Sequence, residues 1–161
     1  MDLLSKPYSG WTDFGLGEQK YSLSYLTKIP IDWLDQAIHG LETLSPFTVH
    51  GFCEPGRLLC LVSYWNCHII YECDGDAALA PADTQHNTVH INMLTFCKLL
   101  FETVSSNLDE WCDWGTHCGS SEKQILKYRR IMRKNLQYRL KRLNVLIQKQ
   151  EKHFSEHCFF C

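Results

Sequence analysis

Residues 122–152 contain neither Gly nor Pro, and their apolar side chains recur every three or four positions, which is the spacing of one helix face. The positions on this face are Ile125, Tyr128, Met132, Leu136, Leu140, Leu143 and Ile147. Ser121, with Gln124 three residues later, forms a capping-box pattern that predicts the start of the helix. A helix of this length spans about 46 Å. The fold must therefore accommodate one long amphipathic helix, packed on its own body or on another chain.

Charge divides the chain at the same place. Residues 122–161 carry eleven Lys and Arg against three Asp and Glu, whereas residues 1–121 carry five against fifteen. The formal total of −2 at pH 7 conceals this separation. We expect an acidic α+β body over residues 1–121, a basic amphipathic helix over 122–152, and a tail rich in Cys, His and Phe over 153–161.

Three consecutive β-rich segments separated by short turns predict an antiparallel three-strand meander in the body. These segments are 47–52, 58–65 and 67–73. Two further segments would extend the sheet: an N-terminal hairpin within residues 10–26, or an edge strand at 88–91.

Helical spacing also occurs within the body. The expected helices are 31–44, which follows Pro30; 93–104, which follows the N-cap candidate Asn92; and a short helix at 108–114. The predicted fold class is therefore α+β, with a small antiparallel sheet packed by helices and a long C-terminal amphipathic basic helix.

The cations of the long helix form the candidate binding surface. The candidates that face away from the apolar stripe are Lys127, Arg130, Lys134 and Lys141, and those flanking it are Arg129, Arg133, Arg139 and Arg142. Lys152 also faces away from the stripe. Such a surface suits phosphates or an acidic protein. The alternative is a solvated helix face whose charges are offset by the acidic residues of the body.

Three aromatic residues near the N-terminus, Tyr8, Trp11 and Phe14, are candidate interface anchors. The alternative is that this N-terminal arm folds back and covers an edge of the sheet.

The tail contains His153, His157, Cys158 and Cys161, which are ligand types found in tetrahedral zinc sites. Four ligands within nine residues leave little chain to close a tetrahedron, so we predict neither a metal nor a cofactor. Cys112 and His117 contain the groups of a nucleophilic pair, but no oxyanion-hole signature accompanies them.

Nine cysteines without an N-terminal signal pattern are typical of reduced thiols in a cytosolic protein, and no apolar run is long enough to span a membrane. The sequence therefore favours a non-catalytic cytosolic protein that binds a protein or nucleoprotein partner, as inhibitors, immunity proteins and counter-defence proteins do. One alternative is a nucleic-acid-binding protein that uses the basic helix. A second is a small enzyme with a Cys/His site, and self-association through the helix also stays open.

Overall fold

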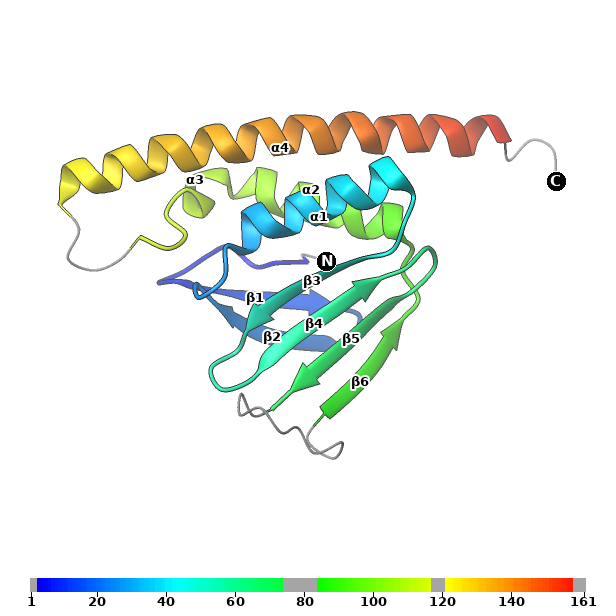
Figure 1. Cartoon of the computed structure of the whole chain (residues 1–161), viewed down its shortest axis with the longest axis horizontal. Coiled ribbons are helices and arrows are strands. Elements are labelled where there is room, and N and C mark those ends of the chain that lie inside the picture. The colour runs from blue at the N-terminus through cyan, green and yellow to red at the C-terminus, as the bar shows by residue number, and fades with distance from the viewer. Residues whose placement is uncertain (1–2, 74–83, 117–120, 158–161) are drawn as a thin grey trace.

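The computed structural model describes residues 3–73, 84–116 and 121–157, with the backbone alone for residues 154, 156 and 157. Its α+β fold confirms the predicted class. The molecule has three layers (Figure 1). Helix α4 (Glu122–His157) covers α1 (Ile29–Thr43) and α2 (Met93–Ser106), and these two helices cover a four-stranded antiparallel sheet.

The four-stranded sheet contains the predicted meander and one further strand. Its strands, in spatial order, are β3 (Phe47–Phe52), β4 (Arg57–Val62), β5 (Cys67–Glu72) and β6 (Thr84–Val89). The edge strand β6 begins four residues earlier than the sequence predicts. Gln85, His86 and Asn87 have weak strand preference, but their pairing with β5 places them in the sheet.

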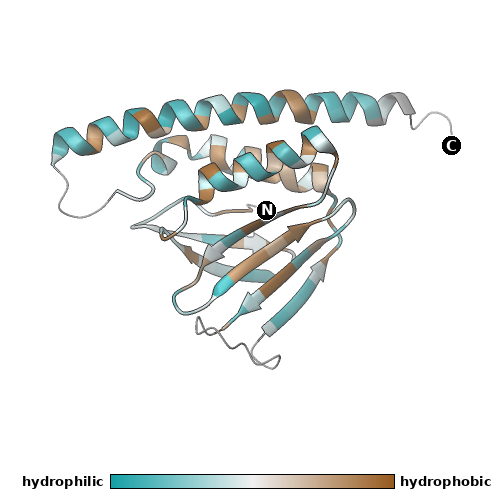
Figure 2. Cartoon of the chain, in the orientation of Figure 1, coloured by the Kyte–Doolittle hydropathy of each residue, from teal (hydrophilic) through white to brown (hydrophobic). Residues whose placement is uncertain are grey.

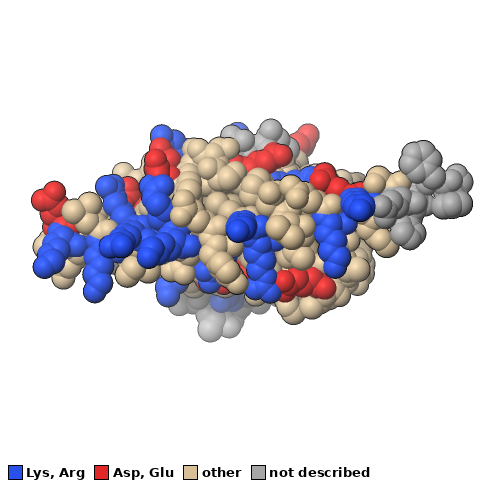
Figure 3. Space-filling view, turned by 90° about the horizontal axis from the view of Figure 1, so that it is seen from above, with Lys and Arg blue, Asp and Glu red and all other residues tan. Residues whose placement is uncertain are grey.

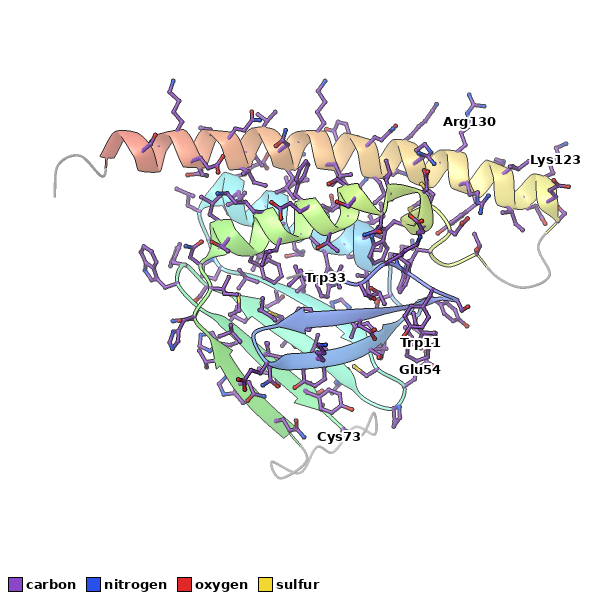
Figure 4. The ribbon with its side chains drawn as sticks, turned by 180° about the vertical axis from the view of Figure 1, so that it is seen from behind. Trp11, Trp33, Glu54, Cys73, Lys123 and Arg130 are labelled. Carbon is purple, nitrogen blue, oxygen red and sulfur yellow. The ribbon has the colours of Figure 1, made fainter. Side chains whose placement is uncertain are left out.

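The N-terminal hairpin forms a sheet of its own and does not extend the meander. Strands β1 (Trp11–Leu16) and β2 (Gln19–Ser24) pack face to face on the larger sheet (Figure 4). The Tyr21 ring lies 4.9 Å from that of Tyr71 on β5, measured between centroids. At the other end of β2, Leu23 packs against Gly51 on β3. The hairpin and the helices therefore share one face of the sheet.

Helices α1 and α2 are held on that face by specific contacts. The Trp33 indole donates a 2.9 Å hydrogen bond to the backbone carbonyl of His50 on β3. Asn92 caps α2 by accepting a 2.8 Å hydrogen bond from the Thr95 amide, as predicted. The short helix α3 (Leu108–Trp111) ends three residues earlier than expected, in a turn closed by Gly115 at φ 81°.

Strands β4 and β5 are largely apolar, whereas α4 alternates between apolar and hydrophilic residues (Figure 2).

The long helix begins where the capping box predicts. The Ser121 backbone amide donates to the side-chain oxygen of Gln124 at 2.8 Å, and the Gln124 backbone amide donates to the Ser121 hydroxyl at 3.4 Å. The helix continues to His157, five residues past its expected end at Lys152. Among the described helices, including α4, none combines the length and hydropathy that a bilayer crossing requires.

Candidate binding surface on α4

The apolar stripe of α4 packs on the body of the same chain. Its buried members belong to the same hydrophobic core as α1 and α2, and they are Met132, Leu136, Leu140, Leu143 and Ile147. At the start of the helix the stripe is less covered, because Ile125 is half-buried and Tyr128 is 37% exposed. From Met132 onward the stripe needs no second chain to cover it.

The four flanking arginines are paired with acidic residues of the body. The pairs are Arg129 with Asp113, Arg133 with Asp109, Arg139 with Asp35, and Arg142 with Glu42. The Arg139 guanidinium contacts both carboxylate oxygens of its partner, at 2.8 and 2.9 Å. Hydrogen bonds to the carboxylates raise the pKa of Arg129, Arg133 and Arg142. Half of the predicted basic surface therefore docks α4 on its own body.

The other four predicted cations, Lys127, Arg130, Lys134 and Lys141, lie on the opposite side of α4 and are exposed. None of the ion pairs within the described residues includes any of them. Arg130 points away from the body in Figure 4. Seen from above, cations gather over the first half of α4 (Figure 3). The structure thus separates the eight cations into an inner, paired set and an outer, unpaired set.

Exposed apolar side chains accompany the outer cations. Ile131, Tyr138 and Val145 are 51%, 65% and 57% exposed. The charge pattern that defines the candidate surface does not include these residues. Their spacing of seven residues is a signal that could have identified them.

The three aromatic candidates of the N-terminal arm have different environments. Tyr8 is 52% exposed, and Trp11 on β1 is half-buried. Phe14 is fully buried and packs edge-on against Trp33, with ring centroids 5.7 Å apart. The prediction of Phe14 as an interface residue was therefore wrong. The alternation of strand β1 turns this side chain into the core, where no partner can reach it.

The cysteine candidate for nucleophilic chemistry is also in the core. Cys112 is 1% exposed, and burial raises the pKa of its thiol. A thiol with a raised pKa holds less of the nucleophilic thiolate at neutral pH. Its candidate partner His117 lies outside the described residues.

The predicted tail is partly helical. His153 and His157 belong to α4, whereas Cys158 and Cys161 lie outside the described residues. No three His, Cys, Asp or Glu side chains in the described part of the chain are grouped so that they could hold a metal ion.

A groove of about 890 Å³ lies near the end of α4, beside the start of α2 and the turn between β4 and β5. Its lining includes Tyr64, Trp65, Met93 and His153, and the Trp65 side chain is 69% exposed. The sequence did not predict this groove, because its residues come from separate segments of the chain.

Comparisons of the chain with protein-family models, curated proteins and solved structures gave no match.

Proposed function

We propose that this chain is a non-catalytic cytosolic binding protein that engages an acidic protein or nucleoprotein through the outer face of α4. Inhibitors, immunity proteins and counter-defence proteins belong to this functional class. The observation that carries the proposal is the unpaired outer set of cations, Lys127, Arg130, Lys134 and Lys141.

The inner arginines strengthen this argument by contrast. Each has a carboxylate of the body within reach, so its charge is already offset inside the molecule. The outer cations have no such partner among the described residues, and no Asp or Glu occurs between positions 123 and 150. Their combined field attracts and orients an acidic partner, which speeds its association.

The non-catalytic part of the proposal is supported by the thiols. Burial raises the pKa of the Cys53 thiol to about 11, and it raises the pKa of Cys97 further. A cysteine nucleophile requires the opposite shift, toward a thiolate near neutral pH. Buried thiols such as Cys97 act as small hydrophobic side chains of the core.

The test is affinity purification of the tagged full chain from the cells that naturally produce it. The α4 variant carries both Lys134→Glu and Lys141→Glu. The control variant carries both Lys20→Glu and Lys28→Glu, at two exposed positions of the body. Both double variants change the net charge equally. We expect a stoichiometric acidic partner that the α4 variant loses and the control retains. Retention by both variants would show that the outer face of α4 is not the binding surface.

Nucleic acid is the second candidate partner, favoured by the absence of acidic residues over positions 123–150. If phosphates bind through the four outer cations, a plot of the logarithm of the affinity against the logarithm of the salt concentration should have a slope of about −3 to −4. A titration with a DNA duplex and an RNA hairpin over a range of salt measures this slope. If neither nucleic-acid probe binds at low salt, direct nucleic-acid binding is excluded.

A further inference from the structure

The outer face of α4 alternates cations with apolar side chains. The series is Lys127, Ile131, Lys134, Tyr138, Lys141 and Val145, with spacings of 4, 3, 4, 3 and 4. All six side chains are exposed, on the side of α4 opposite to its buried stripe. We call these six residues the outer row.

The spacing of the outer row is that of a helix–helix contact line. Steps of three and four average 3.5 residues, which is the repeat that keeps one helix in register with a partner helix in a coiled coil. In heptad terms every apolar residue of the outer row occupies position a and every Lys occupies position d. The inner stripe of α4 uses similar spacing to pack on α1 and α2, so the helix has two faces with helix-packing periodicity.

The apolar residues of the outer row distinguish between two classes of partner, nucleic acid and a protein helix. Phosphates interact with Lys127, Lys134 and Lys141 but gain nothing from covering Ile131 and Val145. A partner helix gains from both, because it removes the exposed apolar surface from water while its carboxylates meet the cations. A second copy of α4 is disfavoured by charge, because its outer face would bring a second set of unpaired cations against the first.

We propose that the outer row docks an acidic amphipathic helix of a partner protein. Apolar side chains of that helix cover Ile131, Tyr138 and Val145, and its Glu or Asp side chains pair with the intervening lysines. This inference rests on the proposed function and specifies the chemistry of the partner.

The probe is a synthetic peptide of about 21 residues with Leu at every a position and Glu at every d position. A control peptide has the same composition in an order that destroys the seven-residue repeat. Fluorescence anisotropy with the full-length chain at about 0.1 M salt measures both affinities. We expect saturable binding of the probe and affinity weaker by about tenfold or more for the control peptide.

Three variants of the chain separate the contributions of the row. One removes the apolar residues (Ile131→Ala, Tyr138→Ala and Val145→Ala), and the second removes the charges (Lys127→Gln, Lys134→Gln and Lys141→Gln). The third, Leu126→Ala, truncates an equally exposed side chain outside the row. Because all these positions are exposed, thermal melting should show an intact fold. We expect the first two variants to bind the probe about tenfold more weakly or worse, and the third to be unchanged.

Three results would overturn the inference. The first is unchanged probe binding by the apolar variant, which means that charge alone governs the surface. The second is tight binding of a DNA duplex that the apolar variant does not weaken, which assigns the face to nucleic acid. The third is no probe binding at all. In each case the purification with Lys134→Glu and Lys141→Glu decides separately whether the proposed function stands.

Discussion

Leu136→Ala tests whether α4 is an integral part of the fold. The Leu136 side chain is 0% exposed and lies near the middle of the buried stripe, in the core that α4 shares with α1 and α2. Truncation removes about three methylene equivalents, worth about 2.4 kcal/mol of transfer free energy, and leaves a cavity that adds to the loss. We expect the free energy of unfolding to fall by about 2–5 kcal/mol.

The measurement is urea unfolding followed by tryptophan fluorescence and by circular dichroism, with the midpoint and slope compared between variants. The control is Leu126→Ala, which makes the same chemical change on α4 at a side chain that is 57% exposed. Its effect should lie within about 0.5 kcal/mol. A loss below about 1 kcal/mol for Leu136→Ala, or separate transitions for the two probes, would refute the integration of α4 into one cooperative core.

Three further predictions follow from the packing and the charges. Gly40→Ala should lower the free energy of unfolding, measured in urea, by about 1–3 kcal/mol, because the new Cβ would overlap the Phe47 ring. A stabilised variant would contradict this contact. A double-mutant cycle of Arg139→Gln and Asp35→Asn should give a coupling of about 0.2–1 kcal/mol that shrinks in about 1 M salt, and a salt-independent value would argue against an ion pair. Burial raises the pKa of Cys53 to about 11, so the stability contributed by its protonated thiol is complete below pH 9 and is lost as the pH rises toward 11. Unfolding midpoints for the wild type and Cys53→Ser across this range should show a shallower decline in the variant, and parallel curves would contradict the shift.

The local elements of the fold could be predicted because their signals are local. The capping box at Ser121 and the cap at Asn92 each involve residues three positions apart, and both form as the sequence indicates. The start of β6 could not be found this way, since residues 84–87 become a strand only through pairing with β5. The same holds for the hairpin, whose place on the sheet depends on contacts such as that of Leu23 with Gly51.

The candidate surface shows the same limit. Helical geometry separated the four arginines beside the stripe from Arg130 and the three lysines opposite it. Which arginines find a carboxylate depends on tertiary distances, such as that between Arg142 and Glu42, which are 100 positions apart in the sequence. Phe14 was assigned to the surface because an aromatic residue in a short arm has no periodic pattern long enough to show which side is covered.

The division of the cations on α4 has a consequence for how the sequence can change in evolution. Replacing an inner arginine such as Arg139 leaves its carboxylate without this partner, so these positions should covary with the body of the same chain. An outer lysine such as Lys134 has no ion-pair partner among the described residues, so under the proposed function its substitutions should follow those of the partner protein. One helix would then be under two kinds of evolutionary constraint, one from its own fold and one from the partner that we propose.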